Sequence, residues 1–544
     1  MFKVNVNNKE MVYEHKITLE AIAESLNIKA YCAKVDNRLR ELTYYLNRDS
    51  KVEFLDLKDI EGVSIYQTTL RYLLVYAIKR IVPKGVVKFS QNISRSFLCT
   101  VNGVRENQAF LDKLTEEMDK IIKENYPIIR TKVSKTEAEK IFAGEGFYDK
   151  IEILKYREEN TVHTYKCNDY YNYMYGYMLP STGYIDKFKL TLHKPGFLLQ
   201  YPRSEENGAI PDFEDSPSLS SVINDAYKWS KTCRIENLAS MNSFTNTREY
   251  VDFVNMCETA HNNRLAYLGD LIKKNIKNIK LIAIAGPSSS GKTTFSNRLR
   301  VELMSRGIFP LLISIDNYYK GHDETPIDEN GKLDYEHIEA IDLDYFNQQL
   351  TELTEGKTVI LPEYDFKDGE RKQGASVKLG KNQPIIIEGI HALNERLTSS
   401  MAREEKYKIY ITPYPQINID NHNPIRVTDI RLLRRIVRDA QFRKTTPEET
   451  FKMWPSVRRG EFKWIYPFQE EADFIFNTEL TYEIMVMKKY AMPVLQSIAD
   501  DSEYFITANR LIKFLKYVKV IDEKYVPCNS ILREFIGGSC FYDR

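Results

Sequence analysis

The chain has 544 residues, and its 77 lysines and arginines nearly balance its 76 aspartates and glutamates, for a formal net charge of +1. This balance argues against nucleic-acid binding through overall basicity, although it is compatible with a local basic patch. The chain shows no secretory signal and no stretch near the ~18 apolar residues of a membrane span, and its seven cysteines never form a CxxC pair, so we expect a cytoplasmic protein with free thiols and no membrane association.

The length favours three or four domains, and the first is a small one over residues 1–60. Apolar strands alternate there with one helical segment, which is a β-grasp-like pattern. The predicted elements are a strand at Phe2–Val6, a helix at Thr18–Leu26 and a strand at Val52–Leu57.

The next region, residues 61–200, mixes helices with strands and predicts an α+β domain. Its clearest predicted helices are Tyr66–Ile81 and Phe110–Asn125. Seven tyrosines fall within the twenty residues from Tyr165 to Tyr184. Tyrosine stacks on bases but also packs half-buried strands, and we favour the packing role.

Residues 201–279 are predicted to be a linker and helical region, which opens with an exposed loop at Tyr201–Ser218. From 280 to 500, short apolar runs of the kind buried on both faces of a parallel sheet alternate with helices such as Leu343–Leu353 and Val427–Phe442. We therefore predict a three-layer α/β sandwich with a parallel sheet. Its strands are expected at Leu281–Ala285, Leu311–Ile315, Pro384–Glu388, Lys408–Thr412 and Asp473–Phe476.

Residues 501–544 are predicted to form a C-terminal helical tail. Its segment Tyr525–Gly538 is apolar enough to dock on the body of the protein. Ser530, Arg533 and the glycine pair that ends this segment could approach a ligand there, but nothing in the sequence requires it.

An eight-residue glycine-rich segment, Gly286-Pro-Ser-Ser-Ser-Gly-Lys-Thr293, lies between the first of these strands and a helical pattern at Phe295–Met304. A strand, a glycine loop and a helix in this order form a phosphate cradle, in which backbone N–H groups and the positive end of the helix face phosphate oxygens. Lys292 would reach the β and γ phosphates, and Thr293 would bind Mg²⁺. The predicted nucleoside triphosphate contacts are Gly286, Ser289, Ser290, Gly291, Lys292, Thr293 and Thr294.

Two acidic residues stand at the ends of later strands, where open α/β sheets bind ligands. Asp316 follows the second strand, and a carboxylate there can accept the proton of an attacking hydroxyl; a capping or turn role is the alternative. Glu388 ends the third strand, the usual position of an acid that coordinates Mg²⁺. A guanine-reading [NT]KxD sequence is absent after the loop, which argues against a GTPase.

The predicted helix from Val427 is unusually rich in arginine. Arg431, Arg435 and Arg438 share one face by their spacing, and Arg443 lies just beyond the end of the helix. Guanidinium groups bind phosphate oxygens bidentately, so such a face suits a phosphate clamp. A basic helix alone is more often a solvated surface, but the preceding loop and acids favour the clamp.

These motifs resemble those of the uridine kinase and phosphoribulokinase group of P-loop kinases, most closely its uridine–cytidine kinase branch. The resemblance extends from Ile282 to about Thr478, with six motifs in the family's order. They are Gly286–Thr293, Asp316–Tyr319, Leu333–Asp342, Pro362–Phe366 with Arg371, Glu388–Ile390 and Arg431–Asp439.

The resemblance implies transfer of the γ-phosphoryl group of ATP, with Mg²⁺, to the 5′-hydroxyl of a ribonucleoside, and uridine and cytidine are the expected acceptors. It implies that Asp316 is the general base. It also implies that Lys292, Arg438 and Arg443 act on the phosphates, the two arginines as a lid. The implied nucleoside contacts are Asp334 and Arg435 on the ribose hydroxyls, with Tyr364 and Phe366 around the base.

Two positions depart from the family's pattern. The family has a base-contacting histidine three residues after the phenylalanine of its Pro-x-Tyr-Asp-Phe motif, and here that position is Gly369. The family's lid commonly reads Arg-Gly-Arg, whereas this one reads Arg443-Lys-Thr445, with Lys444 as a substitute cation. The phosphorylation chemistry is therefore better defined than the base.

Residues 1–60 resemble the TGS domain at the start of threonyl-tRNA synthetases, and residues 61–200 resemble the editing domain that follows it there. In the editing enzyme, an HxxxH pair, a cysteine and a last histidine form a metal-type site. Here only Cys167 remains, and the histidine positions are Thr68, Tyr72 and Tyr171, so we expect no zinc and no editing activity. The segments that carry this resemblance are Leu73–Ile78, Glu124–Ile128, Lys132–Ser134 and Tyr165–Cys167.

Together these patterns predict an ATP- and Mg²⁺-dependent nucleoside kinase with a small-molecule substrate, and we expect a homo-oligomer. A P-loop kinase for another small alcohol or a sugar phosphate is the nearest alternative, because of Gly369. An ATP-switched protein that binds RNA or tRNA is the second alternative, because of the N-terminal half, which would serve either as a ligand-binding scaffold or in oligomerisation.

Overall fold

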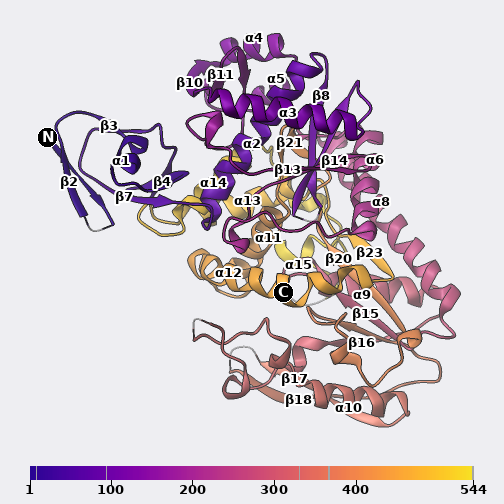
Figure 1. The fold of residues 1–544 in the computed structure, drawn as a ribbon. Helices are drawn as coiled ribbons and strands as arrows, with labels where there is room; N and C mark the ends of the chain where they lie inside the picture. The colour runs from indigo at the N-terminus through magenta and orange to yellow at the C-terminus, as the bar shows by residue number, and fades with distance from the viewer. Residues whose placement is uncertain (8, 94, 245, 330, 366–367, 542–544) are drawn as a thin grey trace.

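The computed structural model describes residues 1–7, 9–93, 95–244, 246–329, 331–365 and 368–541. Its first unit is a five-stranded sheet in the order β2-β1-β7-β4-β5, crossed by helix α1. The buried and exposed residues of β1 alternate strictly, as expected for a strand with one face on the core. The predicted β-grasp-like unit is therefore present (Figure 1). Its elements are β1 (Phe2–Val6), β2 (Lys9–Tyr13), α1 (Leu19–Ser25), β4 (Cys32–Val35), β5 (Arg38–Arg40) and β7 (Ser50–Leu55), with a small pair of β3 (Ile17–Thr18) and β6 (Tyr45–Leu46).

The second unit is built around helix α2, which begins at Ile60, six residues before the predicted start, and ends at Ile81. Residues on all sides of α2 are buried, so the helix is a core element rather than an amphipathic surface one. Two sheets, in the orders β13-β14-β9-β8 and β10-β11-β12, complete the unit. Its other elements are β8 (Val86–Ile93), β9 (Ser96–Asn102), α3 (Gln108–Glu124), β10 (Ile128–Ser134), α4 (Lys135–Glu145), α5 (Tyr148–Leu154), β11 (Thr161–Cys167), β12 (Tyr170–Asn172), β13 (Lys189–His193) and β14 (Gly196–Gln200).

Three helices connect this unit to the next: α6 (Pro217–Thr232), α7 (Leu238–Asn242) and α8 (Thr247–Asn275). The predicted loop at 201–218 contains one short turn, η2 (Ser204–Glu206), and ends where α6 begins. Helix α8 runs along the flank of the following domain and packs beside α9 (Lys292–Met304) (Figure 1).

The next domain is a parallel five-stranded sheet in the order β16-β19-β15-β20-β23. Alternate residues of its central strand enter different buried clusters, Ile282 and Ile284 on one face and Leu281, Ala283 and Ala285 on the other. Helices therefore cover both faces, and the predicted three-layer sandwich is confirmed. All five strands lie within two residues of their predicted ends: β15 (Leu281–Ala285), β16 (Leu311–Ser314), β19 (Ile385–Glu388), β20 (Lys406–Thr412) and β23 (Phe474–Asn477).

Around the sheet lie one long hairpin and several helices. The hairpin and α10 form the end of the molecule opposite the second unit (Figure 1). No helix among the described residues is both long enough and apolar enough to cross a membrane. The elements are α10 (Leu343–Thr354), the hairpin β17 (Thr358–Asp365) and β18 (Glu370–Lys378), α11 (Val427–Phe442), α12 (Pro447–Trp464), α13 (Glu483–Gln496), α14 (Phe505–Lys516) and α15 (Arg533–Ile536).

A short hairpin of the kinase-like domain, β21 (Asn418–Asp420) with β22 (Asn423–Pro424), inserts into the second unit. Lys150 and Asp420 form an ion pair of 2.9 Å, and both side chains are fully buried. His422 lies 3.1 Å from the Asn172 side chain, and its carbonyl accepts a hydrogen bond from Arg71 of α2. These contacts join the two halves through buried polar groups.

The positions that match the editing site in sequence are used for packing. The Thr68 hydroxyl donates to the Ser64 carbonyl, and the Tyr72 hydroxyl donates to the carbonyls of Tyr165 and Tyr170. Cys167 is buried, and burial raises the pKa of its thiol to about 12. Of the seven tyrosines in the 165–184 segment, Tyr165 and Tyr170 are almost fully buried and the other five are half-buried, which agrees with the packing role favoured above.

The Lys150–Asp420 pair predicts a large stability effect. Replacement of Lys150 by Met leaves the Asp420 carboxylate buried without its cation, so the free energy of unfolding should fall by about 3–5 kcal/mol in denaturant titrations. Lys155→Met, which removes an exposed pair with Glu152, is the matched control and should leave the unfolding curve unchanged. Equal stability of the two variants would contradict a buried, coupled junction.

Candidate active site

The phosphate-binding loop joins β15 to α9 at the carboxyl edge of the parallel sheet. Gly286 lies so close to the Ile411 carbonyl that a Cβ atom would overlap it. Gly291 caps α9 with a φ of +90°, a conformation that favours glycine. Both glycines of the motif are therefore required by the backbone geometry of the loop.

Two arginines of α11 hold this loop by its carbonyl groups. Arg431 Nε donates to the Ser288 carbonyl at 3.0 Å, and Arg434 Nη1 donates to the Ser289 and Ser290 carbonyls at 3.4 and 3.3 Å. Both arginines are fully buried, and each also pairs with a buried glutamate. The sequence predicts Arg431 on the phosphate-binding face, but its guanidinium is instead committed to the rear of the loop.

The front of the loop presents groups that fit a nucleotide phosphate. The hydroxyls of Ser289 and Ser290 are buried and have no hydrogen-bond partner among the described residues. Lys292, the first residue of α9, donates through Nζ to the carbonyls of Gly286 and Pro287 at 3.0 and 3.4 Å. Thr293 follows Lys292 in the first turn of α9, where backbone N–H groups lack helical partners. The donor set therefore fits a phosphate chain.

Two acids face Lys292 from neighbouring strands. Asp316 lies in a short turn directly after β16, and Glu388 is the last residue of β19, where its Oε1 accepts from the Ser314 hydroxyl at 2.9 Å. Burial raises the pKa of Glu388 to about 7, with the Asp316 carboxylate adding to the rise and Lys292 opposing it. Burial also raises the pKa of Asp316. Both acids thus lie where the sequence places them.

The donor groups near Asp316 and Glu388 are of the kind that Mg²⁺ requires. The described residues contain no group of three or more His, Cys, Asp or Glu side chains that could hold a metal ion alone. Mg²⁺ commonly binds through one or two carboxylates plus waters and substrate phosphates, so a complete protein cage is unnecessary. Glu388 and the Thr293 hydroxyl fit such a partial set, and a cation there would relieve the repulsion between Glu388 and Asp316.

Three of the predicted arginines surround Asp439 at the end of α11. Arg435 also donates to the Ser288 hydroxyl at 2.9 Å, Arg438 lies 2.9 Å from Asp439, and Arg443 lies 3.7 Å from it. Repulsion from Arg438 lowers the pKa of Arg443 to about 10, although the Arg443 side chain is itself 54% exposed. Crowded cations of this kind are stabilised by an anion, as the predicted lid would require.

The predicted acceptor-binding residues Asp334 and Tyr364 differ in their surroundings. The Asp334 carboxylate accepts the Glu336 N–H at 3.1 Å and so forms a local turn. Tyr364 is buried, donates to the Lys320 carbonyl at 3.2 Å and packs against Tyr319. Phe366 lies outside the described residues.

Glu336 is an acid of this site that sequence reasoning missed. Its Oε2 is buried and has no hydrogen-bond partner among the described residues. Burial raises the pKa of Glu336 to about 7, whereas Arg435 and Lys292 oppose the rise. Glu336 lies only two positions after Asp334, in an irregular segment where no periodicity indicates which carboxylate turns inward.

A histidine from another loop stands beside Gly369. Gly369 has a φ of +70°, and a Cβ atom there would overlap the imidazole of His322. His322 belongs to the turn η4 (His322–Glu324), well before the hairpin in sequence. An imidazole therefore stands next to the position at which this sequence departs from the family's histidine.

Comparisons with known proteins assign the two halves to different relatives. The model of the Phosphoribulokinase / Uridine kinase family matches residues 281–484. A uridine kinase from Macrococcus caseolyticus is 33% identical over 214 residues, which are 38% of this chain and 94% of the relative. A solved structure described as a possible uridine kinase from Bacillus stearothermophilus has 18% identity and a TM-score of 0.27, covering 40% of this chain and 98% of that chain.

The N-terminal region matches a different group. A threonine–tRNA ligase from Thermotoga maritima is 33% identical over 189 residues, which are 34% of this chain and 29% of the ligase. The chain thus spans less than a third of the length of that relative. The predicted resemblance of the N-terminal region to synthetases is confirmed.

The raised pKa of Glu388 predicts a pH-dependent stability of the metal-free protein. In the native state the Glu388 carboxyl keeps its proton up to about pH 7, whereas in the unfolded chain it loses this proton near pH 4.5. The free energy of unfolding that the protonated Glu388 contributes is therefore lost as the pH rises through about 7. Glu388→Gln should therefore raise the free energy of unfolding at pH 8 by about 2 kcal/mol, and the gain should shrink towards pH 5.

The control for this experiment is Glu404→Gln, which neutralises an exposed carboxylate away from the site. Chemical unfolding at both pH values, with a chelator present, should show no comparable gain for the control. A gain for Glu388→Gln that is the same at pH 5 and pH 8 would contradict the assigned pKa.

Proposed function

Because the chain belongs to the phosphoribulokinase / uridine kinase family, we propose that it transfers the γ-phosphoryl group of ATP to the 5′-hydroxyl of a ribonucleoside, with uridine or cytidine as the preferred acceptor. One observation carries the proposal. Lys292, Asp316 and Glu388 converge at one edge of a parallel sheet, and the electrostatic influence of Lys292 reaches both carboxylates. A phosphate-binding cation, a candidate base and a candidate metal ligand are therefore neighbours.

Asp316 is the group we assign as general base. Its raised pKa reflects burial, which makes the carboxylate a better proton acceptor than an exposed one. Lys292, Arg443 and Arg438 oppose the rise in the pKa of Asp316, because their positive charges favour its anionic form. An acceptor hydroxyl within hydrogen-bond reach of Asp316 would give its proton to the carboxylate as its oxygen bonds to the γ-phosphorus, while the bond from that phosphorus to the β,γ-bridging oxygen breaks and ADP leaves.

The other charged residues of the site would bind the phosphate chain and neutralise its charge. MgATP would supply the transferable phosphoryl group, and its metal would neutralise charge on the phosphate oxygens. The loop from Gly286 to Thr294 would hold the phosphate chain, with Thr293 and Glu388 on the side of the metal. Arg438 and Arg443 would neutralise charge on the transferred group and exclude water, which suppresses hydrolysis.

For the acceptor, the proposal adds Glu336 to the residues expected from the sequence. Glu336 lies two positions after Asp334. Its carboxylate and the guanidinium of Arg435 on α11 influence each other electrostatically. A carboxylate and a guanidinium together can accept from and donate to vicinal hydroxyls, as a ribose presents. Tyr364 would pack near the base.

Two alternatives differ from this proposal, one in the acceptor and one in the class of protein. Another small alcohol or a sugar phosphate would use the same base and loop, and only the contacts made by the residues around Gly369, such as His322, would differ. An ATP-switched RNA- or tRNA-binding protein is less well supported, because none of the seven tyrosines between Tyr165 and Tyr184 is fully exposed, and Tyr165 and Tyr170 are buried and hydrogen-bonded within the protein.

The experiment that tests the proposal measures ATP consumption with Mg²⁺ against ribonucleosides, deoxyribonucleosides and sugar phosphates, with total tRNA as a separate arm. Turnover on uridine or cytidine supports the full proposal. Turnover on another acceptor retains the chemistry and changes the substrate. ATP use only with tRNA would overturn the kinase assignment.

Replacement of Asp316 by Asn should lower kcat by about 10³-fold, because general base catalysis contributes about 10²–10⁴-fold. The dissociation constant for MgATP should change little, since the loop is untouched. Asp344→Asn, on the exposed face of α10, is the matched control and should keep normal turnover. Near-normal turnover of Asp316→Asn would show that another group takes the proton.

His322 is expected to contribute to acceptor recognition, because its imidazole stands beside Gly369. His322→Ala should raise KM for the nucleoside by about tenfold, the loss of one hydrogen bond or ring contact, and leave KM for ATP unchanged. His15→Ala, at an exposed site in the first unit, is the control. Unchanged KM for every acceptor would exclude this role.

A further inference from the structure

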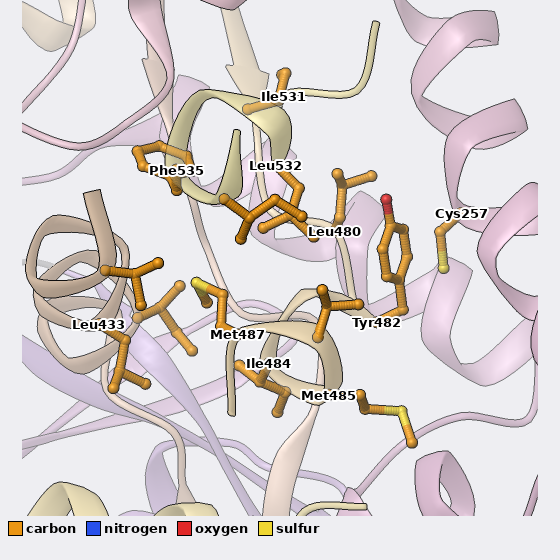
Figure 2. Packing of buried hydrophobic residues seen from close by; sticks show 14 of the residues in the cluster. Cys257, Leu433, Leu480, Tyr482, Ile484, Met485, Met487, Ile531, Leu532 and Phe535 are labelled. Carbon is orange, nitrogen blue, oxygen red and sulfur yellow. The ribbon is translucent and has the colours of Figure 1, made fainter. Parts of the chain in front are cut away.

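The C-terminal segment after α14 covers the start of α9. Ile531, Leu532 and Phe535 are fully buried in the same hydrophobic cluster as Leu433 and Leu480 (Figure 2). The expected docking of the tail on the body is thus observed.

Polar contacts fix the same segment against α11. The Phe535 carbonyl accepts from the Gln441 side chain at 3.1 Å, and the Arg434 guanidinium lies 5.0 Å from the centre of the Phe535 ring. Arg434 is the residue that also holds the rear of the phosphate-binding loop. The tail and the loop therefore both pack against one side chain.

One acidic residue of the segment reaches the nucleotide site itself. Glu534 is only 6% exposed, and its Oε2 accepts the backbone N–H of Thr294 at 3.0 Å. Ile531 lies against the cap of α9, with its Cγ2 2.6 Å from the place of a Cβ on Gly291. A carboxylate thus occupies the positive end of the helix that carries Lys292.

This position is one that a nucleotide phosphate requires. The N–H groups of the first turn of a P-loop helix are the donors that cradle phosphate oxygens. A single backbone N–H cannot donate fully to a carboxylate and to a phosphate, and two anions at this distance repel each other. Lys292 offsets little of this repulsion between Glu534 and a phosphate. Its positive charge already interacts with four carboxylates, those of Glu388, Asp316, Glu534 and Glu336.

We propose that Glu534 is an intramolecular competitor of the nucleotide: its carboxylate must leave Thr294 before the phosphate chain is fully bound. The inference rests on the proposed use of this loop for ATP. Because only the fraction of molecules with Glu534 displaced binds tightly, the measured affinity is reduced by that fraction. The C-terminal segment thereby sets the concentration of ATP at which the site fills.

The test is calorimetric titration of MgATP into the full-length protein and into Glu534→Gln, without an acceptor. Glutamine keeps the size of the side chain and an acceptor oxygen but removes the negative charge. We expect the dissociation constant of Glu534→Gln to be about tenfold lower than that of the unaltered chain, as for a competent fraction of about one tenth.

The matched control is Glu523→Gln, which removes the same charge from the same tail, where the carboxylate pairs with Lys489 at 2.7 Å away from the loop. Its dissociation constant should equal that of the unaltered chain. Thermal unfolding of all three proteins checks the fold, and Glu534→Ala provides a second variant that removes both the charge and the acceptor oxygen. It should also bind MgATP more tightly.

Each outcome decides the inference. Equal or weaker MgATP binding by both Glu534 variants would overturn it and make Glu534 a structural cap of α9. Tighter binding by both, without phosphoryl transfer to any acceptor, would support it while the proposed reaction fails. Absence of MgATP binding in all of the proteins would contradict both the proposed function and the competition.

Discussion

Two buried arginine–glutamate pairs hold the phosphate-binding loop in place, and the rest of the site depends on them. Arg431 pairs with Glu461 and Arg434 with Glu483, and all four side chains are excluded from solvent. Buried ion pairs lose much of their attraction to desolvation, so they are poor sources of stability alone. Their value here is geometric, because the five donors of a guanidinium let one side chain bind a carboxylate and a loop carbonyl together, as Arg431 binds Glu461 and the Ser288 carbonyl.

The front of the same loop has the opposite electrostatic character. Asp316, Glu336 and Glu388 are acids whose pKa values are raised by burial, and Lys292 faces all three. A phosphate chain alone would add to the repulsion between Glu388 and Asp316, whereas a phosphate chain with its divalent cation would offset it. The MgATP proposed above would therefore suit these acids better than a metal-free nucleotide.

The sequence predicts the parts of this arrangement that depend on local order. Buried strands appear as continuous apolar runs, and the order of strand, glycine loop and helix is enough to place Lys292, Asp316 and Glu388 at one sheet edge. Glu336, His322 and Glu534 could not be found in this way. Glu336 lies in an irregular segment, His322 in a short turn and Glu534 in the four-residue helix α15, so no periodicity in the sequence indicates which way each side chain points.

The N-terminal half is connected to the site through helix α11. This helix directly follows the β21–β22 hairpin of the kinase-like domain, which inserts into the second unit. Arg426, the residue before α11, donates to the Ser64 hydroxyl of α2 at 2.7 Å, and Asp429 in the first turn of α11 pairs with Arg510 of α14. A helix is stiff along its axis, and Arg431 and Arg434, which hold the loop, lie within about 11 Å of the start of α11 at ~1.5 Å per residue. Any displacement of the hairpin or of α2 would therefore move the arginines that hold the loop. This connection is a physical link between the synthetase-like half and the helix that holds the phosphate-binding loop.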